Sequence, residues 1–248
     1  MDHEDQFSTV LLRINSRYRT KDSLSSTDFF YQLGSSEVVD SVYRIALIRF
    51  NCLYMFPNIE LTNNTLITSV GTVVIPVGQY TAVELAALLV GVGGTFTLNA
   101  TTRKFEFTAS TTVTIDPTNP LNTLCPYIGL MTPISAVASD VEVMDTFPNL
   151  GGPKSIYVES PNICTSNCLD GNPASGGYLP LLEIIPLAST PYGFVINYHT
   201  NDLISSDVDF KKPITLRRIH IRLTDSHTNA LTLPPNQEVD IVLKVFYR

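Results

Sequence analysis

The chain has 248 residues and a formal net charge of -7 at pH 7. Hydrophobic residues make up 44% of it, which excludes a chain that is disordered throughout. Charged residues are only 16%, against about 25% in ordinary soluble domains. Such a low charge content favours a protein whose surface is covered by other protein. The acidic balance argues against a dedicated nucleic-acid binder, which needs a strong basic footprint.

Alternation of apolar and polar residues, typical of β-strands, dominates the sequence. In chain order the predicted strands are 10–15, 28–33, 38–54, 65–69, 72–75, 95–98, 104–108, 112–115, 155–159, 179–187, 193–198, 216–224 and 239–247. In the longest one, both faces of the strand between Val42 and Phe50 are largely apolar. That pattern is expected inside a sandwich or at a subunit contact.

A single helix is predicted from Thr81 to about Val90. Thr81 fits an N-cap, and Glu84 stands three residues later, which is the spacing of a capping box. Leucines at 85, 88 and 89 then form one apolar stripe before three glycines. Many short strands, turns rich in proline and glycine, and only one helix predict a sandwich or barrel.

No residue pattern points to an enzyme. Neither a phosphate-binding loop nor a dinucleotide fingerprint is present. Asp225, Ser226 and His227 fit a hairpin turn better than a catalytic triad, whose members converge from separate places. His220 alternates with two isoleucines and has no predicted companions for acid–base or metal chemistry. We therefore predict no catalytic residue, no cofactor and no metal site.

Acidic residues gather in two places: Asp140, Glu142 and Asp145, and later Asp202, Asp207 and Asp209. Paired carboxylates can hydrolyse glycosides or bind calcium. The regular ligand spacing of a calcium loop is missing from both sets. We favour solvated loop acids, because most Asp and Glu side chains are exposed.

The four cysteines are predicted to be structural. Cys52 and Cys125 are expected to be buried as small hydrophobic residues. Cys164 and Cys168 share a loop, 161–177, that is expected to be exposed, and they allow either a reduced pair or a local disulfide. A structural zinc would need two more ligands at a usable spacing. A reduced state is the default interpretation.

The first six residues are acidic and no apolar run follows them, so no secretory signal is expected. Basic residues cluster near the start and again near the end of the sequence. A face carrying both clusters could meet an acidic partner or packaged nucleic acid, although solvated strand ends explain them more simply. The candidate inner-face basic residues are Arg13, Arg17, Arg19, Lys21, Lys211 and Lys212.

Three stretches of the sequence carry a resemblance to a known family. The first comprises NSRYR at 15–19, DFFYQL at 28–33 and VYRIALIRF at 42–50, with FPNI at 56–59. The second runs from VIPVGQYT at 74–81 through FTLNATTRKFEF at 96–107, and the third from IHIRLTD at 219–225 to VDIVL at 239–243. Together they resemble the penton and minor capsid proteins of large eukaryotic DNA viruses, virophages and polinton-like elements.

The resemblance implies an all-β protein: an antiparallel single jelly-roll sandwich with a small helix-hairpin insertion. It implies one domain over 1–248, with an N-terminal arm at about 1–27, the helix-hairpin insertion at about 77–130 and a loop insertion at about 136–178. The expected function is non-enzymatic, as the pentameric vertex (penton) subunit of an icosahedral double-stranded DNA virus. Candidate subunit contacts are Tyr43, Phe50, Tyr54 and Phe56, each of which could instead belong to the monomer core.

The expected partners are further copies of the chain, the major capsid protein and other minor capsid proteins. No specific nucleic acid is expected, membrane contact is left open, and the expected location is the virion. Two alternatives remain. One is a minor capsid protein that cements capsomers from between or beneath them. The other is a carbohydrate-binding attachment module, which the absence of tryptophan weakens.

Overall fold

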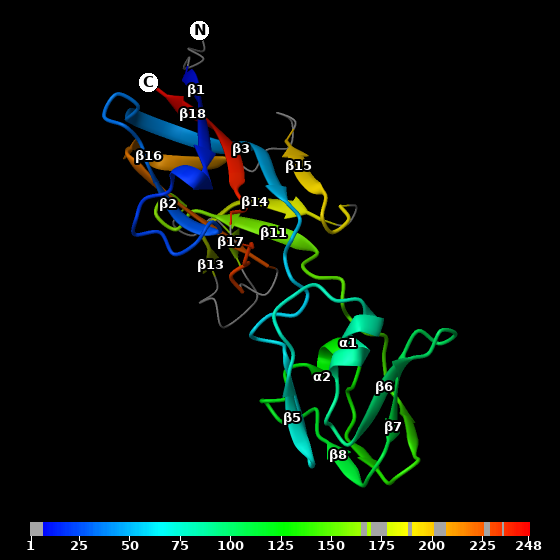
Figure 1. Cartoon of the computed structure of the whole chain (residues 1–248). Helices are drawn as coiled ribbons and strands as arrows, with labels where there is room; N and C mark the ends of the chain where they lie inside the picture. Colours follow the sequence, from blue (N-terminus) through cyan, green and yellow to red (C-terminus); the bar gives the residue numbers. More distant parts are fainter. Residues whose placement is uncertain are drawn as a thin grey trace. The chain divides into compact units, whose positions relative to one another are not determined.

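The structure is a computed structural model that describes residues 7–164, 168–169, 178–187, 190–200, 207–225, 229–234 and 236–248. The chain divides into two compact units, each with its own core (Figure 1). Unit 1 is Met1–Phe56 with Pro153–Arg248, and unit 2 is Pro57–Gly152. The predicted helix-hairpin insertion, about 77–130, falls within unit 2, and the single domain over 1–248 stays a prediction.

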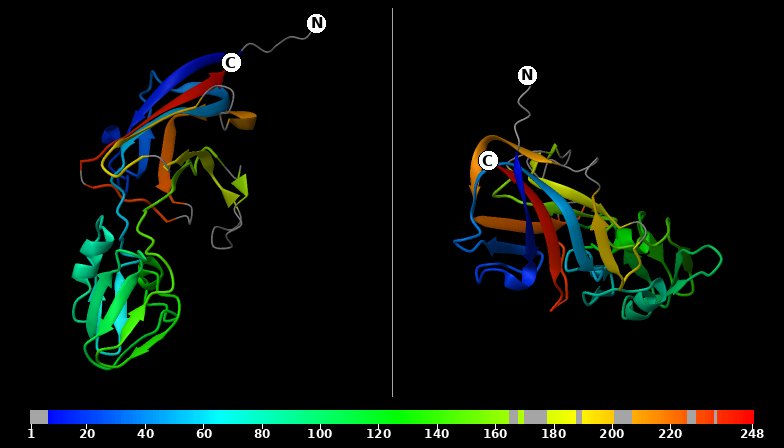
Figure 2. Two further views of the ribbon diagram at one scale, coloured as in Figure 1. Left: turned by 90° about the vertical axis from the view of Figure 1, so that its right-hand side faces the viewer. Right: turned by 90° about the horizontal axis from the view of Figure 1, so that it is seen from above.

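Unit 1 is built from antiparallel strands in two main sheets. In the first sheet, β18 (Val239–Tyr247) lies between β1 (Ser8–Asn15) and β3 (Val39–Leu53). The far side of β3 pairs with both β15 (Val195–His199) and β16 (Val208–Leu216). Figure 2 shows β1, β18 and β3 side by side. The predicted N-terminal arm, about 1–27, therefore contains a strand that pairs with β18 from Ser8 to Asn15.

The second sheet of unit 1 has the order β2-β17-β11-β14. Its strands are β2 (Asp28–Gln32), β17 (Arg218–Thr224), β11 (Ser155–Glu159) and β14 (Leu181–Pro186). A short 3-10 turn, η1, covers Ser16–Tyr18, and β12 (Cys168–Leu169) pairs with β13 (Tyr178–Leu179).

The connectivity of these two sheets is that of a jelly roll. Eight strands form the roll and can be numbered 1 to 8 in chain order: β1, β2, β3, β11, β14, β15, β17 and β18. In these numbers the first sheet has the order 1-8-3-6 and the second sheet the order 2-7-4-5. Each sheet thus alternates strands from the first and second halves of unit 1, as two interlocked Greek keys require. The predicted all-β antiparallel single jelly roll is confirmed.

The core of unit 1 follows from the alternation of the strands. On β17, Ile219, Ile221 and Leu223 are buried in the core, whereas Arg218, His220 and Arg222 are only partly buried. Successive side chains of a strand point to opposite faces, so one face of β17 closes the sandwich and the other carries polar groups. Each aliphatic side chain buried in this way contributes about 1.5–3 kcal/mol.

Unit 2 is held together by small sheets and two short helices. Its elements are β4 (Thr65–Thr68), β5 (Gly71–Val74), α1 (Ala82–Leu88), β6 (Gly94–Leu98), β7 (Phe105–Ala109), β8 (Val113–Ile115), α2 (Cys125–Ile128), β9 (Ile134–Ala136) and β10 (Val141–Val143). The sheets have the orders β10-β7-β6, β4-β5 and β8-β9. Phe105 and Phe107 of β7 lie in the centre of the apolar cluster.

The predicted helix and its capping box are confirmed in α1. The Glu84 carboxylate accepts a hydrogen bond from the Thr81 backbone N–H at 2.8 Å, and the Thr81 hydroxyl accepts one from the Glu84 N–H at 3.3 Å. Each bond satisfies a donor that a helix N-terminus otherwise leaves open. Of the predicted apolar stripe, Leu85 and Leu89 lie in the core of unit 2, whereas Leu88 is exposed.

Buried asparagines fix the irregular segments of unit 2. The Asn58 amide donates to the carbonyls of Tyr80 and Leu150 at 2.8 and 2.9 Å, and its oxygen accepts from the Tyr80 N–H at 2.9 Å. Asn122 bridges the backbone of Ile67 and Asp116 in the same manner. Because a buried amide needs all its partners, each of these side chains specifies one loop conformation.

Six of the described elements were not predicted: η1, α2, β9, β10, β12 and β16. In β16, Lys211, Lys212 and Pro213 interrupt the apolar alternation, and the pairing with β3 shifts register between Asp209 and Ile214. Among the described residues no helix is long and apolar enough to cross a membrane.

Candidate assembly surfaces

Three of the four predicted subunit contacts are core residues of unit 1. Phe50 and Phe56 are both 0% exposed, and Tyr54 is also buried in the same cluster. Side chains without exposed surface have none to give to a neighbouring subunit. The prediction is therefore corrected for these three residues: the apolar pattern of the strand reflects packing between the two sheets of the sandwich.

Tyr43, the fourth predicted contact, remains partly exposed. Its ring lies 5.5 Å from that of Phe7, and the Arg248 guanidinium stands over both rings at 5.2 and 4.8 Å. Cation–π and aromatic contacts of this kind tie the start of β1, the middle of β3 and the C-terminal residue together. Tyr43 as a subunit contact stays a prediction.

In the part of the chain that the structure describes, no strand pairs with the outer edges of β1 and β15, and apolar side chains are exposed at both. On β1, the outermost strand on one side, Leu11 is 62% exposed and Val10 is exposed as well. At the other edge, Phe194 and Val195 are 63% and 62% exposed at the start of β15. Unpaired edges with apolar side chains mark interaction sites in a soluble protein.

The candidate basic residues lie in two different settings. Arg13 of β1 donates to Asp240 at 2.8 Å, and Arg17 lies 3.8 Å from Glu238, so both positive charges are balanced locally. The Arg19 guanidinium donates to the Ser16 carbonyl at 3.0 Å. The three lysines, Lys21, Lys211 and Lys212, are exposed.

Two of these basic residues, Arg17 and Arg19, line a groove. It has a volume of about 490 Å³ and is open to solvent. Arg17, Arg19, Ser25, Ser26 and Glu238 supply its polar lining. Because Glu238 already balances Arg17, the groove does not form a concentrated anion site.

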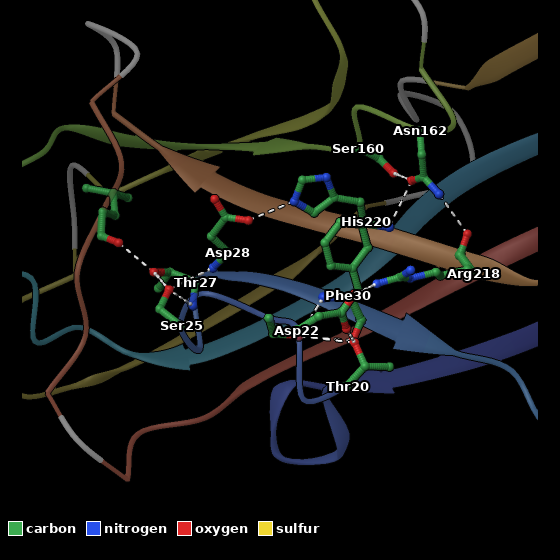
Figure 3. Close-up of polar contacts among 12 residues, drawn as sticks. Thr20, Asp22, Ser25, Thr27, Asp28, Phe30, Ser160, Asn162, Arg218 and His220 are labelled. Atoms are coloured by element: carbon green, nitrogen blue, oxygen red, sulfur yellow. Dashed lines mark hydrogen bonds and ion pairs between the residues drawn. The ribbon is translucent and has the colours of Figure 1, made fainter.

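A polar cluster covers the outer face of β2 and β17 (Figure 3). The His220 ring stacks on Phe30 with centroids 4.2 Å apart, and its Nε2 lies 2.7 Å from an oxygen of Asp28. The Arg218 guanidinium stands 3.9 Å from the Phe30 centroid and pairs with Asp22. Sequence alternation predicted that His220 points away from its isoleucine neighbours, but it did not identify this stack.

The cluster also organises a loop. The Asn162 side-chain amide donates to the Arg218 carbonyl at 2.8 Å, and its oxygen accepts from the backbone N–H of His220 at 2.8 Å. These two bonds anchor the turn after β11 (Figure 3). The Ser160 hydroxyl donates to Asn162 and not to His220. Together with the stack of His220 on Phe30, these hydrogen bonds join β2, β17 and the turn after β11. The arrangement therefore stabilises the second sheet.

The two predicted sets of acidic residues have different partners: two members of the first set accept backbone hydrogen bonds, and two members of the second pair with one arginine. Asp140 accepts from the Val137 N–H at 2.9 Å, and Asp145 accepts from the backbone of Met131 and Thr132. Asp207 and Asp209 both pair with Arg44, at 3.2 and 2.6 Å. Among the described residues no three histidine, cysteine, aspartate or glutamate side chains form a group that could hold a metal ion.

Some predicted candidates lie outside the described residues, namely Asp202, Ser226 and His227. Asp225, which is described, accepts a hydrogen bond from the Asn229 N–H at 2.9 Å, as the predicted turn requires. Cys52, Cys125 and Cys164 are free and buried. Burial raises the pKa of each of these thiols to about 12, so they stay protonated and unreactive at neutral pH.

Asp145 is expected to make the stability of unit 2 depend on pH. Backbone hydrogen bonds from Met131 and Thr132 hold the pKa of its carboxyl below the usual value. The stabilisation is therefore present at neutral pH and is lost as the pH falls through the acid range. We expect Asp145→Asn to lower the free energy of unfolding at pH 7 by about 1 kcal/mol, since solvent screens the exposed carboxylate.

This loss is measured by chemical denaturation at pH 7 and at a series of lower pH values, over which the gap in stability between the variant and the unchanged protein should narrow. Asp140→Asn is the matched control, because Asp140 accepts a single backbone hydrogen bond. A gap between Asp145→Asn and the unchanged protein that stays constant across the series would contradict the expected role.

Comparison with known proteins shows the fold. No family description and no curated protein matches the sequence. Among solved structures, the mavirus penton protein matches with a TM-score of 0.52 and 13% identity, covering 97% of this chain and 100% of that one. The Sputnik virophage structure solved by cryo-EM matches with a TM-score of 0.48, 13% identity, and 96% and 98% coverage. The predicted resemblance is confirmed at the level of the fold, on the first of these matches.

Proposed function

We propose that this protein is a structural, non-enzymatic capsid subunit, and specifically the subunit of a pentameric vertex in an icosahedral double-stranded DNA virus. The observation that carries the proposal is the fold shared with a penton protein over 97% of this chain and the whole of that one. The jelly-roll connectivity of unit 1 supports it, because capsid proteins use this sandwich. So does the low content of charged residues, 16%.

The proposed mechanism is geometric. Copies of unit 1 stand around a closed axis, and each buries one side of its sandwich against a different side of the next copy. Obligate contacts of this type bury roughly 2,000 Å² or more, which a charge-poor surface favours. The partners are further copies of the chain, the major capsid protein and other minor capsid proteins, within the virion.

We further propose that the exposed lysines Lys21, Lys211 and Lys212 belong to the inner face of the capsid. Arg13, Arg17 and Arg19 contribute less to that face than their number suggests. Two of them are balanced by Asp240 and Glu238, and the third bonds a carbonyl. The net positive charge available for packaged nucleic acid is therefore small, so only a weak, sequence-independent attraction to it is expected from this face.

The mass of the purified full chain in solution tests the pentamer. Light scattering coupled to size exclusion should report five times the 27.3 kDa of the chain. Labelling the chain and imaging particles should then place it at the vertices. A stable monomer at micromolar concentration would contradict the ring, and a position between capsomers away from the vertices would favour the cement protein.

A further inference from the structure

Among the described residues, no strand pairs with the outer edge of β1 or of β15, whereas the edges at β2 and β16 are protected. The edge of β2 is covered by the segment before it, because the Thr20 and Leu24 N–H groups donate to the carbonyls of Phe30 and Asp28 at 2.9 and 3.0 Å. The Ser23 hydroxyl accepts from the Phe30 N–H at 3.0 Å. The backbone of β2 is thus closed to a new strand.

The β16 part of the first sheet is protected by its side chains. Lys211, Lys212 and Pro213 are all exposed on this strand, and its pairing with β3 is bulged. Edge lysines, prolines and bulges are the devices by which soluble proteins prevent one sheet from pairing with another. Unit 1 therefore uses two kinds of edge protection.

Among the described residues, no covering strand, lysine, proline or bulge protects the edges of β1 or β15. The one charged residue of β1, Arg13, is ion-paired with Asp240 of the adjacent β18. Residues 7–12 and 190–198 contain no charged side chain. On β1, Val10 and Leu11 alternate and are both exposed, so each face of this strand carries apolar surface. On the other side, Tyr192, Phe194 and Val195 are exposed around the start of β15. Exposed apolar edges of this kind are retained where a partner covers them.

We propose that the β1 edge of one copy of this chain docks against the β15 edge of the next copy, which makes the first sheet the site of ring closure. This inference rests on the proposed function, because a closed ring of identical subunits needs two different surfaces on each one. The occupant is a second copy because each edge exposes apolar side chains in a stretch without charged residues, 7–12 and 190–198, and the two edges lie at opposite ends of one sheet (Figure 1).

The strand directions agree with this contact. Every neighbouring pair in the order β1-β18-β3-β15 is antiparallel, so β1 and β15 run in opposite directions. A second copy placed beside the first in the same orientation sets β1 antiparallel to β15. That is the more stable of the two ways in which strands lie side by side.

Two single variants test the contact: Leu11→Asp on the β1 edge and Phe194→Asp on the β15 edge. Each is expected to weaken self-association at least about thirtyfold, since a desolvated apolar anchor is replaced by a charge. Both should give monomers by light scattering with unchanged circular dichroism. Val83→Asp, at a residue of α1 that is 65% exposed, is the matched control and should assemble normally.

Mixing the two monomeric variants gives the sharpest result. Leu11→Asp keeps an intact β15 edge and Phe194→Asp keeps an intact β1 edge, so an equimolar mixture should form a 1:1 heterodimer that cannot grow. The double variant should bind neither. Leu11→Thr, which keeps strand propensity, serves as a milder second change should the aspartate disturb folding.

The outcomes separate this inference from the proposed function. If the unchanged chain is a monomer, the proposed ring itself is wrong. If the unchanged chain forms a ring and both aspartate variants still assemble, the ring stands and the assigned edges are wrong. A Phe194→Asp variant that assembles while Leu11→Asp does not would overturn the pairing of unlike edges and indicate a symmetric β1–β1 contact.

Discussion

Replacing Phe50 with alanine is expected to lower the free energy of unfolding of unit 1 by about 3–5 kcal/mol, the usual cost of deleting a buried aromatic ring. Phe50 is 0% exposed and lies in the core cluster between the two sheets. The loss combines the transfer free energy of the ring with the cavity it leaves, because neighbouring side chains relax only in part.

The measurement needs a probe other than tryptophan fluorescence, because the chain has no tryptophan. Urea unfolding followed by circular dichroism gives the free energy, and hydrogen exchange read by mass spectrometry assigns the loss to unit 1. Phe147→Ala is the matched control, since that phenylalanine is 63% exposed. A Phe50→Ala variant that keeps its stability and loses only self-association would restore Phe50 as a subunit contact.

A methyl group added at Gly129 is expected to destabilise unit 2 by more than 3 kcal/mol. Gly129 ends α2 with φ at +84°, in the left-handed region, and a Cβ there would lie 2.2 Å from the Thr146 carbonyl oxygen. The left-handed backbone alone costs a non-glycine residue about 1–2 kcal/mol. The overlap with a backbone atom adds to this, because neither segment can move away cheaply.

Gly91→Ala separates these two contributions. Gly91 also has a positive φ, +76°, but a Cβ there would meet no atom within 4 Å. The Gly91 variant should therefore show only the backbone cost, and the difference between the two variants measures the overlap at Gly129. Hydrogen exchange should show that Gly129→Ala lowers the protection of backbone amides first in residues 57–152, which form unit 2, and only later in the sandwich of unit 1. Equal losses in both variants would contradict the overlap.

Local sequence patterns were enough to predict most strands and the one capped helix. Thr81 and Glu84 encode the start of α1 within four residues, so the capping box could be found without any knowledge of the fold. The strand that contains Phe50 was also predicted, but its burial was not assigned. Packing against the second sheet and packing against another subunit both select apolar side chains.

Other features depend on contacts between distant parts of the sequence. The pairing of β1 with β18 joins Ser8 to Tyr247, and no local pattern shows that β1 ends the sheet. The role of Asn58 comes from Tyr80 and Leu150, so its residue type alone gave no signal. In β16 the two lysines and the proline hid the strand. The jelly roll itself was predicted from the family resemblance rather than from periodicity.

Unit 2 leaves the sandwich after Phe56 and returns to it at Pro153. Within unit 1, the Tyr54 hydroxyl donates to the Pro153 carbonyl at 3.4 Å, so the two points of departure are held near each other by the sandwich itself. The insertion joins two consecutive strands, β3 and β11, without contributing a strand to either sheet. The insertion can therefore be lengthened, exchanged or removed while the sandwich keeps its strand pairing, and a foreign domain could be grafted at the same junction.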